Sequence, residues 1–201
     1  MRRCLALAFL VPASLVAQAV GDSVVPDLRA LMAAPRSEMA AVVSRWSSDR
    51  AALGRRHAVE YSPTRRERMQ TYHRTWLARL DGLPFATLSR PAQVDAILLR
   101  TRVEYELARL DREARLAAEM APLLPFADTL YAMLEQRRQL IRPEAEVAAR
   151  RLAWMADAIE VTRTALGRPG ATVPSRIVAL RAAEAIGDLS RDTEAWRRFY
   201  V

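Results

Sequence analysis

The sequence lacks lysine and asparagine altogether, and its 201 residues include one cysteine, two histidines and six glycines. Because Cys4 is the single cysteine, no disulfide can form within the chain. The scattered glycines provide neither a glycine-rich phosphate loop nor a Gly-x-Ser-x-Gly nucleophile elbow. The histidines, His57 and His73, do not form a His-Glu-x-x-His zinc pattern. These absences exclude the familiar sequence layouts of phosphate-binding loops, serine hydrolases and zinc peptidases.

Positive charge is abundant, with 31 basic against 23 acidic residues and a formal net charge of +8. Every basic residue is an arginine, and with the many alanines and the absent asparagine this indicates a codon bias towards GC-rich DNA. The arginines are interleaved with acids at helical spacing, as in Asp111/Arg115 and Glu146/Arg150, which is typical of solvated helix faces. No nucleic-acid-reading motif accompanies them, so we expect no nucleic-acid partner.

The first 19 residues have the layout of a secretory signal peptide. Arg2 and Arg3 precede an apolar run over residues 4–17, and Ala17-Gln18-Ala19 supplies a small-x-small cleavage pattern. A membrane anchor is the alternative, but this run of roughly a dozen residues falls short of the ~20 that cross a bilayer. We therefore predict a signal peptide over residues 1–19 and a helical domain over residues 20–201. The mature protein is expected in the periplasm or outside the cell, without a membrane span.

Apolar residues recur at helical spacing throughout the remainder, and no window shows the period-two alternation of strands. The expected fold is all-α, an array or bundle of about six to seven helices with one long central helix and no sheet. The predicted helical segments cover residues 24–34, 37–53, 62–81, 89–120, 126–141, 143–166 and 172–186, with a last segment from about residue 192.

Capping residues and prolines set the predicted boundaries. Ser37, Ser62, Ser89 and Ser190 are predicted N-caps. Gly54 and the stretch over residues 57–61 are predicted to end the helix that Ser37 begins. The turn between the long helix and its successor is attributed to the prolines at positions 122 and 125, which interrupt the helical hydrogen bonds.

The long helix over residues 89–120 carries two apolar stripes, which predicts packing on two sides. The first stripe comprises Val94, Leu98, Thr101, Tyr105 and Ala108. The second comprises Ile97, Val103, Leu107, Leu110 and Ala114. The predicted helical segment over residues 172–186 runs through Ile177, Leu180, Ala183 and Ile186.

Few residues are candidates for chemistry. His73 lies beside the predicted core stripe of its helix, so packing explains it better than metal binding. Two carboxylate pairs, Glu104 with Asp111 and Glu106 with Glu113, each share a helix face, and paired carboxylates can do acid/base work. The arginines at positions 100, 102, 109, 112 and 115 lie within one turn of these acids, which favours a structural ion-pair network.

Several phrases of the sequence resemble the N-terminal half of an exported bacterial family, domain of unknown function 885. They are residues 88–100 (Leu-Ser-Arg-Pro-Ala-Gln-Val-Asp-Ala-Ile-Leu-Leu-Arg), Glu104-Tyr105-Glu106-Leu107 with Leu110-Asp111, and Trp196-Arg197-Arg198-Phe199-Tyr200. Members of that family are similar to helical zinc metallopeptidases, with a His-Glu-x-x-x-x-x-His-His-like motif in their second half. None of those metal ligands has a counterpart in this sequence.

The resemblance implies the N-terminal helical portion of an exported zinc-metallopeptidase-like hydrolase of unknown substrate. No catalytic, cofactor-binding or metal residue is assigned in this chain, and zinc is expected only in the C-terminal half. Because the family continues beyond the equivalent of Tyr200, a fragment or truncated reading frame is expected. The predicted partners are that C-terminal half or a second copy, together with a peptide substrate. The alternative is a free-standing helical binding or scaffolding protein of the cell envelope.

Overall fold

The computed structural model describes residues 37–200, which belong to one compact unit. The predicted signal peptide and the predicted helix over residues 24–34 lie outside the described residues. Within them the structure contains six α-helices, two short 3₁₀ helices and no strand, so the all-α prediction is confirmed. The α-helices are α2 (Ala40–Arg56), α3 (Pro63–Asp81), α4 (Arg90–Met120), α5 (Ala127–Arg138), α6 (Ala145–Leu166) and α7 (Arg176–Tyr200). The 3₁₀ helices are η1 (Phe85–Thr87) and η2 (Ala121–Leu123).

Two of the predicted serine caps are confirmed. The Ser62 hydroxyl accepts a hydrogen bond from Arg65 N at 3.3 Å at the start of α3, and Ser89 accepts one from Ala92 N at 3.5 Å at the start of α4. Each serine is followed by a proline in the first helical turn, where the missing amide proton costs nothing.

The other two caps and the role of Gly54 were wrong, whereas the predicted break from His57 onward is confirmed, because α2 ends at Arg56. Met39, rather than Ser37, caps α2, and the Ser37 hydroxyl instead accepts from Met39 N at 3.1 Å. Helix α2 continues through Gly54 to Arg56, because packing along the helix outweighs the ~1 kcal/mol that glycine costs there. Ser190 lies inside α7, which is one continuous helix rather than two segments.

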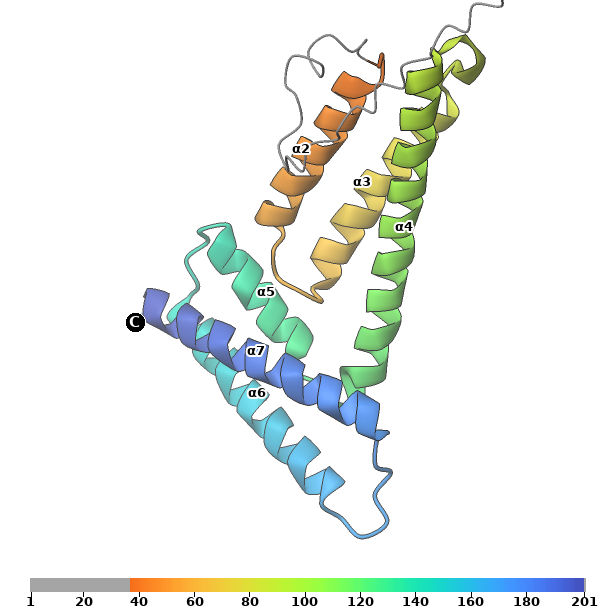
Figure 1. Ribbon diagram of the computed structural model, residues 1–201. Coiled ribbons are helices and arrows are strands. Elements are labelled where there is room, and N and C mark those ends of the chain that lie inside the picture. Colours follow the sequence, from red (N-terminus) through yellow and green to blue (C-terminus); the bar gives the residue numbers. More distant parts are fainter. Residues whose placement is uncertain (1–36, 201) are drawn as a thin grey trace, which may run out of the picture. The chain divides into compact units, whose positions relative to one another are not determined.

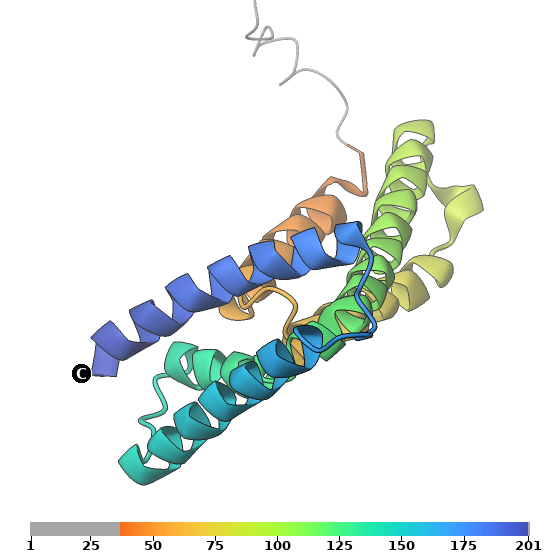
Figure 2. The same cartoon turned by 90° about the horizontal axis from the view of Figure 1, so that it is seen from below.

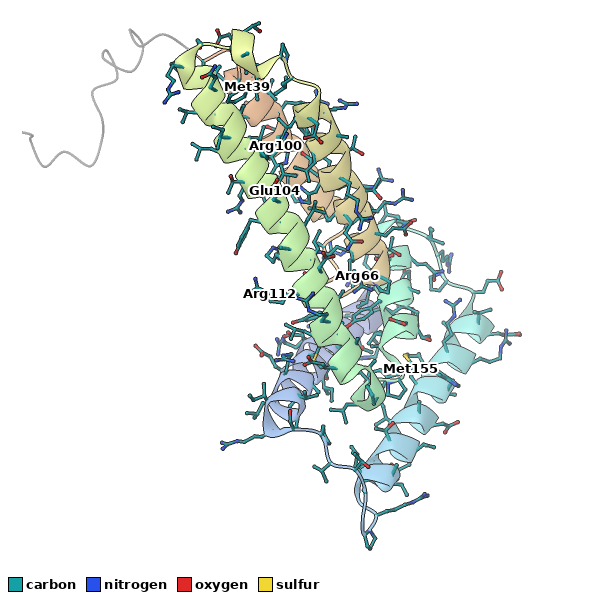
Figure 3. All side chains as sticks on the ribbon, turned by 90° about the vertical axis from the view of Figure 1, so that its right-hand side faces the viewer. Met39, Arg66, Arg100, Glu104, Arg112 and Met155 are labelled. Carbon is teal, nitrogen blue, oxygen red and sulfur yellow. The ribbon has the colours of Figure 1, made fainter. Side chains whose placement is uncertain are left out.

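Helices α2, α3 and α4 contact one another side by side, and α7 contacts both the lower part of α4 and α5 (Figures 1 and 2). The turn from α4 to α5 is the short 3₁₀ helix η2, which contains Pro122 as expected. Figure 3 looks onto the outer side of α4, along which Glu104 and Arg112 project. None of the helices between residues 37 and 200 combines the length and apolar character that a bilayer crossing requires.

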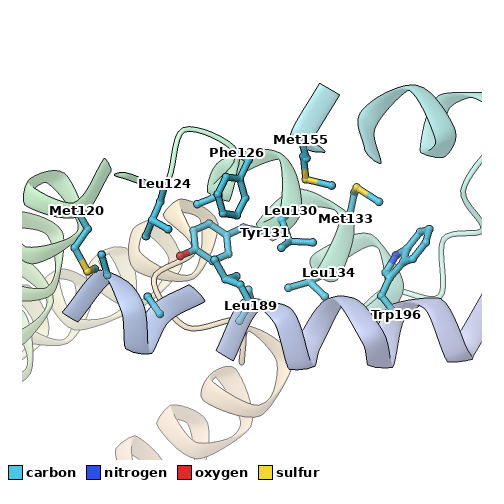
Figure 4. Packing of buried hydrophobic residues seen from close by; sticks show 14 of the residues in the cluster. Met120, Leu124, Phe126, Leu130, Tyr131, Met133, Leu134, Met155, Leu189 and Trp196 are labelled. Atoms are coloured by element: carbon cyan, nitrogen blue, oxygen red, sulfur yellow. The ribbon is translucent and has the colours of Figure 1, made fainter. Parts of the chain in front are cut away.

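The buried hydrophobic residues form two clusters. The N-terminal cluster joins α2, α3 and the first half of α4, and consists of Met39, Trp46, Leu80, Ala92, Ala96, Leu99 and Val103. The C-terminal cluster joins the end of α4 to α5, α6 and α7, and its large members include Met120, Leu130, Met133, Met155 and Trp196 (Figure 4). Burying a side chain of this size contributes about 1.5–3 kcal/mol, so these clusters dominate the stability of the fold.

The predicted two-sided packing of α4 was wrong within the described residues. Its buried face contains Val103 and Leu110, both 0% exposed. The opposite stripe remains in solvent, with Val94 46%, Leu98 62% and Tyr105 52% exposed. Only one side of α4 is therefore covered by the described helices.

The large aliphatic residues of α7 do not form its buried face. Ile177 and Leu180 are 68% and 61% exposed. The buried residues of α7 are Ala182, Ala185, Leu189 and Trp196. Small alanines bring α7 close to its neighbours, while the larger aliphatic residues point away from the core.

Candidate functional site: a buried ion-pair network and an arginine-lined cavity

The two histidines lie in different surroundings. His73, on α3, is 0% exposed, and its ring contacts the rings of Trp46 and Tyr72 with centroids 6.2 and 5.1 Å apart. Neither ring nitrogen has a hydrogen-bond partner among the described residues. His57 caps the C-terminal end of α2 and lines a cavity of about 460 Å³ that also includes Glu135. Burial is the main cause that lowers the pKa of both histidines, to about 4 for His73.

Glu106 is the buried member of the predicted carboxylate pairs, with a side chain 2% exposed. Arg102 Nη2 lies 2.7 Å from its Oε1, Arg109 Nε lies 3.0 Å from its Oε2, and Arg50 Nη1, from α2, lies 3.6 Å from Oε1. Burial raises the pKa of Glu106, but the surrounding guanidinium groups outweigh it and hold the pKa below its usual value. His73 approaches the same charges, and Glu106 opposes the lowering of its pKa.

The remaining predicted carboxylates divide between the inner and outer sides of α4. Glu113 lies 2.9 Å from Arg65 Nη1, which comes from α3. Asp111 accepts a hydrogen bond from Gln70 at 2.9 Å, and Glu104 is 55% exposed. Each carboxylate that the structure buries on α4 is matched by arginines, so a structural network accounts for Glu106 and Glu113 better than acid/base catalysis does.

A cavity of about 960 Å³ lies among α2, α5 and α7 and the loop between α2 and α3. Arg55 and Arg56 reach it from the end of α2, and Arg137 and Arg138 from the end of α5. None of these four forms an ion pair with any residue in the range 37–200. Arg191, from α7, also lines the cavity and contacts Asp188. A volume near the upper end of the 300–1,000 Å³ typical of ligand pockets makes this the main candidate binding site.

The cavity wall combines charge with apolar surface. The Arg137 guanidinium lies 5.1 Å from the centre of the Phe199 ring, an arrangement that holds it by a cation–π contact. Tyr131 is buried in the wall, and burial raises the pKa of its hydroxyl to about 12, so it remains a neutral hydrogen-bonding group. Glu60 and Asp192 also line the cavity and reduce its positive charge without pairing with the four arginines.

Strained backbone occurs at the same place. Tyr61 and Leu140 are the two non-glycine residues in the described chain with positive φ, at 60° and 58°. Both line the arginine-rich cavity. Such conformations cost about 1–3 kcal/mol each and tend to occur where a fixed local geometry serves a function.

No group of three or more His, Cys, Asp or Glu residues in the described chain could hold a metal ion. The arrangement offers binding by charge and apolar contact. Sequence reasoning missed the cavity, because its arginines come from segments about 80 and 50 residues apart that only the fold brings together.

Comparisons with protein-family models, with curated proteins and with solved structures find no match to this chain.

Proposed function

We propose that this helical unit is a binding protein whose arginine-lined cavity holds an acidic segment of a polypeptide. The main support is that Arg55, Arg56, Arg137 and Arg138 all line one cavity. None of them has an acidic partner among residues 37–200. Guanidinium groups match carboxylates in shape and charge, and each pair can form two parallel hydrogen bonds. The apolar wall formed with Phe199 suits a peptide that alternates acidic and apolar side chains.

Helix-end electrostatics provide an alternative reason for these arginines. Positive side chains are favourable near helix C-termini, where α2 and α5 both end, typically by about 0.3–1 kcal/mol each. That effect explains why arginine is tolerated at each end. Helix-end electrostatics do not explain why the ends of α2 and α5 face the same cavity. A ligand that binds all four arginines would require that arrangement.

Fluorescence anisotropy with a short labelled peptide of alternating glutamate and leucine tests the proposal. We expect saturable, salt-sensitive binding that is lost when all four arginines are changed to glutamine. A matched control changes the exposed Arg74, Arg79, Arg112 and Arg115 to glutamine, which removes the same charge outside the cavity.

Three outcomes count against the proposal. Equal loss in the control variant would show that net charge, rather than the cavity, attracts the peptide. Equally tight binding of the corresponding glutamine–leucine peptide would remove the role of carboxylates. Competition by a single-stranded oligonucleotide at lower concentration than the peptide would favour a nucleic-acid ligand instead.

A second candidate function follows from the resemblance to domain of unknown function 885, in which these helices form the non-catalytic portion of an exported metallopeptidase-like hydrolase. The observation that favours it is the sparse covering of α6. This helix of 22 residues buries only Ala148 and Met155, while Trp154 and Val161 are 48% and 69% exposed. Large exposed apolar residues of this kind mark surfaces that another polypeptide covers.

Site-specific photo-crosslinking in the producing cell tests this second function. A photoreactive residue at Trp154 is expected to capture a metal-binding polypeptide, whereas one at the exposed Arg163, on the opposite side of the same helix, captures none. Recovery of a metal-free partner, or no recovery at Trp154, contradicts it.

A further inference from the structure

The outer stripe of α4 has the spacing of a coiled-coil seam. Its residues follow one another at alternating steps of four and three. They are Val94, Leu98, Thr101, Tyr105 and Ala108. At about 100° per residue this stripe lies opposite the buried face through Ala96, Val103 and Leu110. The same helix therefore serves the core on one side and presents a second, unoccupied seam on the other.

All five residues of this seam are exposed in the described structure. A solvated helix face would not need apolar side chains at regular seam positions, since it costs nothing to place charged residues there. The seam spans ~21 Å along α4 and is bounded by Pro91 at its start and Arg112 at its end. Its length suits one helix lying alongside.

The charges that flank the seam identify the helix that fits. Arg102 and Arg109 directly follow Thr101 and Ala108 and flank the seam on one side. Glu104 and Asp111 flank it on the other side. In a parallel pair of identical helices, Glu104 of each copy faces Arg109 of the other, so opposite charges meet across the seam. An antiparallel pair would place like charges together.

We propose that two copies of this chain associate in parallel along the outer seam of α4. Arg109, which would pair with Glu104 across the seam, also binds Glu106 of its own chain, which the five donors of a guanidinium allow. Because the seam is short and includes Thr101 and Ala108, the dimer is weak and forms in the micromolar concentration range. This association is independent of the peptide site, since the cavity is lined by other helices.

Sedimentation equilibrium over a range of concentrations tests the association. The purified chain is expected to form a dimer that Leu98→Glu with Tyr105→Glu abolishes. The matched control, Ile177→Glu with Leu180→Glu, changes an equally exposed apolar pair on α7 and should leave the dimer intact. Glu104→Arg places repelling charges at both symmetric positions and should weaken dimerisation by ~tenfold or more.

Disulfide trapping tests the direction of the helices. In a chain carrying Cys4→Ser, Val94→Cys and Tyr105→Cys should each link to the same position of a second copy, because parallel helices align identical residues. Linking only through Thr101→Cys would show an antiparallel pair and overturn the charge argument. A chain that is monomeric at every concentration, or a dimer unaffected by Leu98→Glu with Tyr105→Glu, would overturn the proposal. Circular dichroism confirms that each variant is folded, and unchanged peptide binding separates this result from the fate of the peptide site.

Discussion

Acidification is expected to destabilise the fold through His73. Burial lowers the pKa of its ring from 6.5 to about 4. Between these two values the unfolded chain binds a proton that the folded chain excludes, so the free energy of unfolding falls as the pH falls. A difference of about 2.5 pKa units at 1.36 kcal/mol per unit predicts a loss on the order of 3 kcal/mol between about pH 6.5 and pH 4.

The charges around the ring explain why burial prevails. Glu106 favours the protonated form, but Arg50, Arg102 and Arg109 surround that carboxylate and oppose a further positive charge. The pKa of Glu106 is itself lowered, so its stabilising contribution is lost only below its ordinary value of 4.5. The two groups therefore act in successive parts of the acid range, with His73 first.

Urea denaturation followed by far-ultraviolet circular dichroism at a series of pH values measures the effect. We expect His73→Leu to remove most of the dependence between about pH 6.5 and pH 4, since leucine fills the site without a titrating group. His57→Gln is the control, because that ring is only partly buried and should account for a small part of the slope. A wild-type free energy of unfolding that is level across this range, or an unchanged slope in His73→Leu, would refute the reasoning.

Three further changes test the core, the ion network and the continuity of α7 by thermal melting. Glu106→Gln should lower the free energy of unfolding by about 2–3 kcal/mol, because the surrounding arginines lose their buried carboxylate partner. The loss stays in this range since those arginines keep some access to water. Glu104→Gln, on the exposed side of α4, should cost under ~0.5 kcal/mol. Leu110→Ala should cost about 3 kcal/mol by opening a cavity in the core, whereas Leu98→Ala should leave the stability of the monomer nearly unchanged. Ser190→Pro should cost ~3 kcal/mol, since it breaks the middle of α7, and an unchanged melting temperature would mean that the helix is interrupted there.

The beginnings of α3 and α4 could be predicted from sequence because their signals are local. A serine hydroxyl, a proline and the next amide groups lie within one helical turn, so Ser62 and Ser89 act as caps whatever the rest of the chain does. Gly54 misled for the complementary reason. A helix-weakening residue has a small intrinsic cost, and tertiary packing of residues such as Trp46 overrides it.

Which side of a helix is buried was harder to predict. The core face of α7 is built partly from Ala182 and Ala185, whose small side chains give a weaker apolar pattern than Ile177 and Leu180 on the exposed side. In a sequence pattern, large apolar residues give the stronger signal for a buried face. In the structure, alanine at the buried face lets two helices approach closely. A stripe of large apolar residues indicates a contact surface without showing whether the same chain supplies the contact.

The candidate site shows the same limit. The ion pairs within α4, such as Arg102 with Glu106, follow from helical spacing and were predicted. Arg50 and Arg65 join the network from other helices, and no spacing rule connects them to α4. The arginine-lined cavity depends entirely on how the ends of α2 and α5 meet.

The sparse attachment of α6 has a consequence for how the protein opens. A segment held to its neighbours by two buried residues, Ala148 and Met155, can separate from them at a fraction of the free energy that global unfolding requires. Its backbone amides therefore exchange with solvent through local opening, ahead of those around Val103 and Leu110 in the covered face of α4. Each such opening exposes the Met155 side of the C-terminal cluster, so we expect proteolysis of the native protein to begin at α6 rather than at the long helix.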